Sequence, residues 1–249
     1  MRLYFYLMVA FAAWSGVIYT AGNLPDVIGK GGIIKPGLAV QFASSSEDVD
    51  NAFTLKPPVS PAVKDIDLRG RVRLQQYLDF VFIVLYALVF YLVIGRTLRA
   101  SGTQVVRGLG TLVCILIILA AAADFLEDFA ILHVLRSDHP AFWPLWFGVP
   151  KWIAFFLAMG CSAALFLARS GNAIFSGASS EWLSFLVMVS GVLLPGGALL
   201  GLIGLACLSR GCGYLVPTGA AFILLPMIVL LVQCGSNAGI FGSTEASGH

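Results

Sequence analysis

Long runs of apolar residues dominate the chain, and short stretches rich in charged residues, glycine and proline separate them. An α-helix that crosses the hydrocarbon core of a membrane needs about 20 apolar residues in succession. Runs of this kind occur near 3–21, 77–95, 108–132, 144–168, 182–208 and 213–234. The runs are continuous rather than alternating, which argues against the strands of a membrane β-barrel. The sequence therefore predicts an all-α, polytopic transmembrane helical bundle of about six spans.

Charged residues are too scarce for a soluble domain of this size. They make up 11% of the chain, whereas 59% of the residues are hydrophobic; a soluble domain carries roughly 25% charged residues. The formal net charge is only +2, and the basic residues gather at the ends of the apolar runs. This distribution excludes nucleic acid as a partner. The predicted partner is the lipid bilayer, with other membrane subunits or further copies of the chain as additional partners.

The distribution of polar residues divides the chain into five regions. The first apolar run is longer than the apolar core of a usual signal peptide, so we expect a retained signal anchor. The predicted regions are a first transmembrane helix (1–21), an extramembrane segment with a short strand and a helix (22–75), transmembrane helices two to four (76–168), transmembrane helices five and six (169–235) and a polar C-terminal tail (236–249).

The segment 22–75 contains three local patterns. IIKPGLAVQFA (33–43) predicts a short strand pair, or a strand after a bend at Pro36-Gly37. SSSEDVDNAF (44–53) predicts a helix, with one of its three serines as the N-cap. LKPPVSPAV (55–63) predicts an extended linker. The segment is too small to bury a core of its own. We therefore expect it to be ordered against the membrane face of the helices, as a lid or docking element.

The orientation in the membrane follows from the basic residues. Arg96, Arg99 and Arg107 lie in one short loop without an acidic residue, which favours the cytoplasm. A signal-like first run also normally exports the segment that follows it. A plain count of basic residues on the other side favours the opposite orientation. We expect a multi-pass protein of the cell membrane with residues 22–75 on the extracytoplasmic side.

Five ionisable residues lie at the ends of successive apolar runs. Asp79 opens the second run, Asp124, Glu127 and Asp128 close the third, and Lys151 opens the fourth. Because successive spans are antiparallel, all five lie toward the same side of the membrane. The three acids of the third run are three or four residues apart and share one helix face. Charges in hydrocarbon are unfavourable, so this face should point into the bundle or a wet cavity. We expect one polar site in which the lysine pairs with at least one acid.

The same residues resemble a motif pattern in a family of small bacterial membrane proteins that has no assigned activity. The quoted stretches are DFVFIVLY (79–86), DFLED (124–128) and KW (151–152). They are similar to an Asp-Phe-x-Phe, an Asp-x-x-Glu-Asn and a Lys-aromatic motif on successive helices. An N-terminal helix and a short exported segment with a strand precede them, so the resemblance covers roughly residues 1–168. Asp128 stands where the pattern has asparagine, which adds a negative charge. The resemblance implies the architecture and the cluster, but no activity.

Three functions are compatible with this polar cluster. It is a structural network if Lys151, Arg73 or Arg136 neutralises the acids. It is a transport or ion-coupling site if the carboxylates bind protons or cations. It is a metal-dependent membrane enzyme if a divalent ion acts there on a lipid or lipid-linked substrate. The sequence has no nucleophile–base pair, phosphate loop or metal-ligand spacing. It therefore favours the two non-enzymatic functions, leaves the catalytic residues of the enzyme alternative unknown, and predicts no metal and no other cofactor.

The fifth apolar run contains a second candidate feature, Pro195-Gly196-Gly197. Transporters use such interruptions of a helix to bind ions with backbone groups. The alternative is a packing face, because Gly197 and Gly201 form a GxxxG pair that lets helices approach closely. The sequence thus names these three residues as helix-break candidates and favours the packing alternative.

Overall fold

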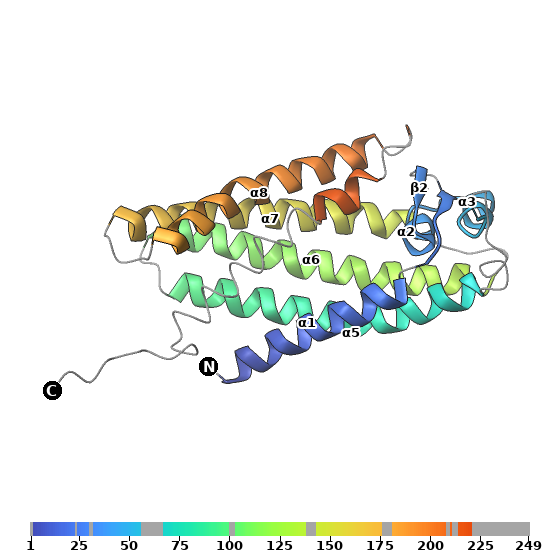
Figure 1. Cartoon of the computed structure of the whole chain (residues 1–249), viewed down its shortest axis with the longest axis horizontal. Coiled ribbons are helices and arrows are strands. Elements are labelled where there is room, and N and C mark those ends of the chain that lie inside the picture. The colour runs from blue at the N-terminus through green and yellow to red at the C-terminus, as the bar shows by residue number, and fades with distance from the viewer. Residues whose placement is uncertain are drawn as a thin grey trace.

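The computed structural model describes residues 2–22, 24–29, 32–55, 67–99, 103–137, 143–175, 181–207, 210 and 214–220. Long helices form an elongated bundle, and small elements gather at one end of it (Figure 1). Along the chain, each long helix packs on the next. The elements are α1 (Arg2–Gly22), β1 (Val27–Gly29), β2 (Gly32–Ile34), α2 (Pro36–Gln41), α3 (Ser46–Asn51), α5 (Leu68–Arg99), α6 (Gln104–Val134), α7 (Leu145–Phe175) and α8 (Glu181–Ala206).

Among the described residues, three helices are long and apolar enough to cross a membrane, and they support a membrane-embedded protein. The qualifying stretches are Leu68–Leu92 of α5, Gln104–Val134 of α6 and Leu145–Ala164 of α7. In α1 and α8 the apolar helical stretches are shorter, at Val9–Ala21 and Val192–Ala206. Most of the sixth predicted run, 213–234, lies outside the described residues.

Helix α6 has the distribution of side chains that lipid demands. Its outer face exposes large apolar residues, among them Ile118, Leu119 and Phe129. Its inner face buries Val113 and Ile117, and then the three acids about two to three turns further along. In water this arrangement would be unfavourable, because apolar surface would face solvent while charge would be buried. In hydrocarbon it is the expected arrangement, because the polar groups find partners only inside the bundle.

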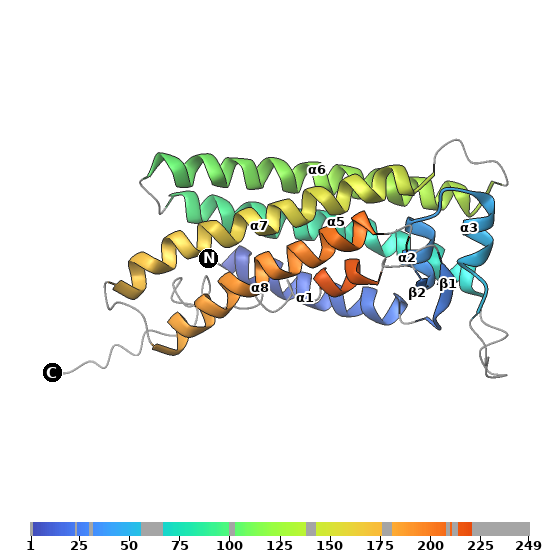
Figure 2. The same cartoon turned by 90° about the horizontal axis from the view of Figure 1, so that it is seen from above.

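The small elements at the end of the bundle form a cap, which we define as residues 24–55. Strands β1 and β2 pair antiparallel, with Val27 opposite Ile34. Helix α2 contacts β1, α5 and α6, and α3 contacts β1. Figure 2 shows α2, α3 and both strands gathered at the end of the long helices. Val27, Val40 and Phe42 are fully buried, so the cap belongs to the same apolar core as the bundle.

The secondary structure of the cap corrects part of the sequence prediction. The segment 33–43 was expected to form a strand pair or a strand after Pro36-Gly37; instead β2 ends at Ile34 and a helix begins at Pro36. Proline suits the first turn of a helix, because its fixed φ is helical and its missing N–H would have no partner there. The strand partner comes from upstream, in β1. The predicted helix at 44–53 is present as α3, with the Ser45 hydroxyl accepting from the Asp48 N–H at 3.1 Å.

Helix α5 begins before the second apolar run, inside the region that the sequence assigned to the extramembrane segment. Helix α5 begins at Leu68, whereas the apolar run begins near residue 77. Asp67 caps this helix, because its Oδ1 accepts from the Gly70 N–H at 2.8 Å. Hydropathy misses the first turns because they carry three arginines, which are good helix formers despite their charge. Most of the predicted proline-rich linker, from residue 56 on, lies outside the described residues.

Helix α8 continues without a break through the helix-break candidates Pro195, Gly196 and Gly197. The glycines of this helix serve packing instead. A Cβ placed on Gly219, in the helical turn 215–220, would collide with the backbone of Gly197 and Gly201. Close approach of two backbones is what a GxxxG face provides. The alternative that the sequence favoured is therefore the one that agrees with the structure.

Candidate functional site

Lys151 lies at the centre of the polar cluster, in the second turn of α7. Its ammonium donates to Asp124 Oδ1 at 2.8 Å and also to Glu127 Oε2. Only 6% of the lysine and none of the glutamate is exposed. The expected pairing of the lysine with at least one acid is thus present, and it joins α7 to α6. Charge-assisted hydrogen bonds of this kind are about twice as strong as neutral ones.

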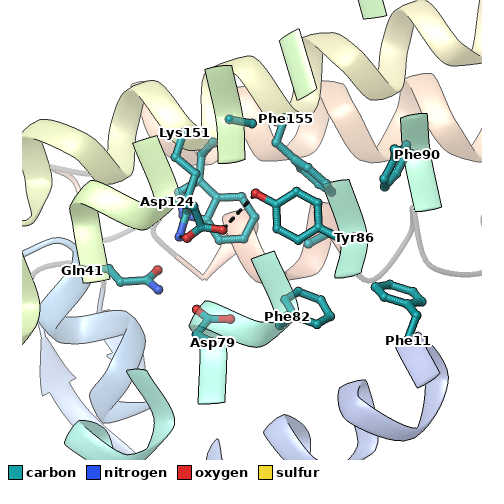
Figure 3. Close-up of a pocket in the computed structure, with 12 residues that line it drawn as sticks. Phe11, Gln41, Asp79, Phe82, Tyr86, Phe90, Asp124, Lys151 and Phe155 are labelled. Carbon is teal, nitrogen blue, oxygen red and sulfur yellow. Dashed lines mark hydrogen bonds and ion pairs between the residues drawn. The ribbon is translucent and has the colours of Figure 1, made fainter. Parts of the chain in front are cut away.

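Asp124 is the residue through which three helices meet. Its Oδ1 accepts from the lysine of α7, and its Oδ2 accepts from the Tyr86 hydroxyl of α5 at 3.1 Å. Both carboxylate oxygens of Asp124 therefore have a donor. Figure 3 shows the tyrosine hydroxyl pointing at this carboxylate.

Asp128 is buried in a different way. None of its surface is exposed, and neither of its carboxylate oxygens has a hydrogen-bond partner in the part of the chain that the structure describes. Oε1 of Glu127 is also buried without a partner there. Buried polar atoms without partners are rare in folded proteins, and each one requires an explanation. An unpaired carboxylate in a low-dielectric interior is especially unfavourable.

Asp79 of α5 completes the cluster. One carboxylate oxygen from each of Asp79, Asp124 and Asp128 lies within 4.8 Å of the other two. Three carboxylate oxygens this close together can act as ligands of one cation. The sequence predicted no metal site, since ligands from two different helices have no characteristic spacing along the chain. The sequence did contain one indication of the triangle: Asp79 and the acids of the third apolar run were expected toward the same side of the membrane.

A cavity of about 300 Å³ adjoins the cluster. Figure 3 shows Gln41, Asp79, Asp124 and Lys151 on one side of this space, with Phe11 and Phe90 on the other. The polar residues thus occupy one end, and aromatic rings form most of the remaining wall. The lining residues are Phe11, Gln41, Asp79, Phe82, Tyr86, Phe90, Ala120, Asp124, Lys151, Trp152, Phe155 and Ala220.

The two arginines that were alternatives to Lys151 make other contacts. Arg73 donates to the Leu135 carbonyl at the C-terminal end of α6, at 3.3 Å. A cation at this position also interacts favourably with the helix dipole. Arg136 donates to the Tyr77 hydroxyl at 2.7 Å. Among the described residues, Lys151 is therefore the only cation in contact with the acids.

The cap contacts the start of α7 next to the polar cluster. The Leu145 N–H, at the start of α7, donates to the Ala43 carbonyl at 3.4 Å. A Cβ on Gly148 would lie 2.6 Å from Glu127 Oε1 and 3.2 Å from the Gln41 carbonyl oxygen. Glycine at 148 therefore lets α7 approach both α6 and the cap closely. Gln41 also lines the cavity, so the cap forms part of the site.

Sequence reasoning missed three contributors to the site: Tyr86, Gln41 and the aromatic wall. Tyr86 lies seven residues after Asp79, two turns along the same helix, so a shared face was the available signal. No sequence pattern placed Gln41 at the site, because the fold of the cap depends on tertiary contacts that hydropathy does not encode. The aromatic residues resemble ordinary lipid-facing or core residues in a sequence this apolar.

No protein family, curated protein or solved structure was found to match the chain. The resemblance of the motifs to a bacterial membrane-protein family thus stays an expectation.

Proposed function

We propose that this protein is a small multi-pass transporter or ion-coupling protein that binds a cation in its buried carboxylate cluster. In this proposal α1, α8 and the apolar run near 213–234 complete about six spans together with the three long helices. The cap lies on the extracytoplasmic side, so the cluster opens toward that face. The cation is a proton or a metal ion.

The balance of charge in the cluster carries the proposal. Four carboxylates, those of Asp79, Asp124, Glu127 and Asp128, face one ammonium. Lys151 is in contact with Asp124 and Glu127. Asp128 is fully buried, and no described residue donates a hydrogen bond to its carboxylate. Several uncompensated charges of one sign are not stable together in a low-dielectric interior. Bound protons or a bound metal cation would compensate them.

The cavity supports a function that requires access. Asp79 and Asp124 line it, so two of the three carboxylates of the triangle border a space that a solute or water can occupy. Ionisable residues inside membranes commonly mark ion or proton pathways. A network that only fixed helix register would need neither the cavity nor a buried Asp128 to which no described residue donates.

The triangle of carboxylates also favours a second candidate, a metal-dependent enzyme that acts on a lipid or lipid-linked substrate. Asp79, Asp124 and Asp128 present oxygen ligands of the type that divalent ions prefer. The aromatic cavity beside them would hold an apolar part of such a substrate. A strict requirement for a divalent ion, with no effect of protons or monovalent ions, would favour the enzyme over the transporter.

The first test measures metal binding. The purified protein in detergent is unfolded by heat in the presence of Na⁺, Ca²⁺ or Mn²⁺, at ionic strength held constant with potassium chloride. A ligand at about 100 times its Kd stabilises the folded state by about 2.7 kcal/mol. We expect Asp128→Asn to remove that stabilisation. Glu47→Gln is the control, because Glu47 is an exposed acid of α3, outside the cluster.

The second test measures protons. The protein is reconstituted into vesicles that enclose a pH-sensitive dye, and a membrane potential is applied. We expect acidification of the lumen with the native chain and with Glu47→Gln, and none with Asp128→Asn. If neither metals nor protons give a response that depends on Asp128, the proposed function is wrong.

A further inference from the structure

The chemistry of the cavity walls points to the class of solute. We infer that the cavity binds an organic cation, an amine or quaternary ammonium group attached to a compact apolar body. This inference rests on the proposed function, because it names the solute that a cation-binding cluster would accept beside it. Three features of the cavity favour such a solute: the Asp79 carboxylate, which pairs with no described residue, the aromatic walls, and a lysine whose ammonium already binds two acids.

Asp79 supplies the anchor for the cationic group. It lines the cavity, and within the described ranges its carboxylate has neither a hydrogen bond nor an ion pair. Its neighbours in the carboxylate triangle are Asp124 and Asp128. Asp124 already has a donor on each oxygen, so Asp79 is the carboxylate available to a solute in the cavity. A cation placed there would also reduce the repulsion within the triangle.

The aromatic rings favour the same charge. Phe82, Phe90 and Phe155 line the cavity together with the ring of Tyr86. The faces of such rings carry partial negative charge and attract cations within about 6 Å of the ring centroid, most strongly where water is excluded. The site already contains one example, because the Lys151 ammonium lies 5.1 Å from the centroid of the Trp152 ring. Aromatic rings beside a carboxylate are the usual surroundings of a bound quaternary ammonium group.

An anionic solute would not find a partner. The Lys151 ammonium is the cation that borders the cavity, and Asp124 and Glu127 already bind it. A carboxylate or phosphate group would therefore have to displace a buried acid and then lie beside the others. Repulsion in a low-dielectric site makes this arrangement unfavourable. The cavity volume of about 300 Å³ is at the lower end of the range for small-molecule sites, which limits the solute to a compact body.

The test uses two probes of the same shape. Benzyltrimethylammonium carries the cationic group, and neopentylbenzene replaces its nitrogen with carbon and is neutral. Binding to the purified protein in detergent is measured by equilibrium dialysis and by quenching of tryptophan fluorescence, since Trp152 lines the cavity. We expect saturable binding of the cation and at least tenfold weaker binding of the neutral probe. Equal binding of both probes would mean that the cavity only accepts apolar groups such as lipid chains, and would overturn the inference, as would the absence of binding.

Two variants locate the probe. Asp79→Asn should weaken binding of benzyltrimethylammonium at least tenfold, and Asp79→Glu should restore part of it. Phe155→Leu keeps an apolar wall but removes a ring, and should weaken binding about fivefold. Phe125→Leu is the control, because Phe125 lies on the exposed face of α6. Elution of each variant as a single species in size-exclusion chromatography excludes misfolding. Unchanged binding in both cavity variants would overturn the inference.

The two proposals fail separately. If Asp128→Asn abolishes the response to metals or protons while benzyltrimethylammonium does not bind the native chain, the proposed function stands and the inference is wrong. If the ammonium probe binds through Asp79 but no response depends on Asp128, the cavity is a binding site and the coupling function is wrong.

Discussion

Replacement of Lys151 by methionine should destabilise the protein strongly, because it removes the cation that pairs with the cluster. The lysine makes two charge-assisted hydrogen bonds, to Asp124 and Glu127, and 6% of its surface is exposed. Each such bond contributes about 1.5–3 kcal/mol. Removal of one partner from a buried ion pair lowers stability by about 3–5 kcal/mol. Both figures predict that Lys151→Met lowers the free energy of unfolding by about 3–5 kcal/mol.

A double-mutant cycle with Glu127→Gln tests the cause of that loss. Glutamine has nearly the shape of the glutamate but carries no charge, so the double variant no longer leaves the Glu127 carboxylate buried beside a missing cation. We expect an interaction energy of about 2–3 kcal/mol between the two changes. The assay is denaturant unfolding in detergent micelles, followed by tryptophan fluorescence and far-UV circular dichroism.

Lys35→Met is the matched control for this cycle. The Lys35 ammonium lies 3.0 Å from Asp26 Oδ1, but about half of each side chain is exposed. A surface ion pair contributes about 0–1 kcal/mol, and the Lys35 ammonium also donates to the Leu24 carbonyl at 2.6 Å. This variant should therefore lose no more than about 2 kcal/mol. If Lys151→Met and Glu127→Gln were additive within about 0.5 kcal/mol, the pairing of these two residues would not stabilise the fold. The cluster would then be a solvated cavity instead.

Three further changes test individual contacts. Gly148→Ala should lower stability by about 1–3 kcal/mol, because its Cβ would meet a buried carboxylate at 2.6 Å. Gly160→Ala is the control, because a Cβ there would meet open space, and it should not lower stability. Thermal unfolding in detergent compares the two variants. Tyr86→Phe should cost about 1–3 kcal/mol through the lost hydrogen bond, and Tyr91→Phe, which is exposed, should change little in the same assay. Ser45→Ala should destabilise α3 by about 1 kcal/mol through the lost N-cap. Amide hydrogen exchange should become faster only at residues 46–51. Unchanged exchange would mean that the Ser45 hydroxyl does not stabilise this helix.

The apolar runs predicted the long helices well, because burial of the backbone in hydrocarbon leaves few alternatives to a helix. The membrane side shared by Asp79, Asp124 and Lys151 also followed from the sequence, since antiparallel spans fix which helix ends meet. The cap was predicted less well. Its strand pairing and the helix at Pro36 depend on tertiary contacts, and short polar segments carry weak periodicity.

The details of the site were beyond the sequence for a related reason. The i+3 and i+4 spacings placed Glu127 and Asp128 on one helix face. They could not show that Glu127 contacts Lys151 and that Asp128 does not. That difference depends on how α7 is rotated and on the close approach at Gly148. Pro195 made a helix break conceivable from the sequence, because the local effect of a proline does not reveal whether neighbouring helices hold the chain in a helical path.

The ion pair between α6 and α7 has a consequence for how the chain enters the membrane. Asp124 and Lys151 are 27 residues apart, so at about 5–20 residues per second the lysine is synthesised roughly 1–5 s after the aspartate. During that interval the acids of α6 have no ammonium, and each buried acid opposes insertion by about 2.5–3.5 kcal/mol. Release of α6 into lipid becomes favourable once α7 arrives beside it. The two helices should therefore leave the insertion machinery as one hairpin, and truncation of the nascent chain before residue 151 should leave α6 outside the bilayer or still bound to that machinery.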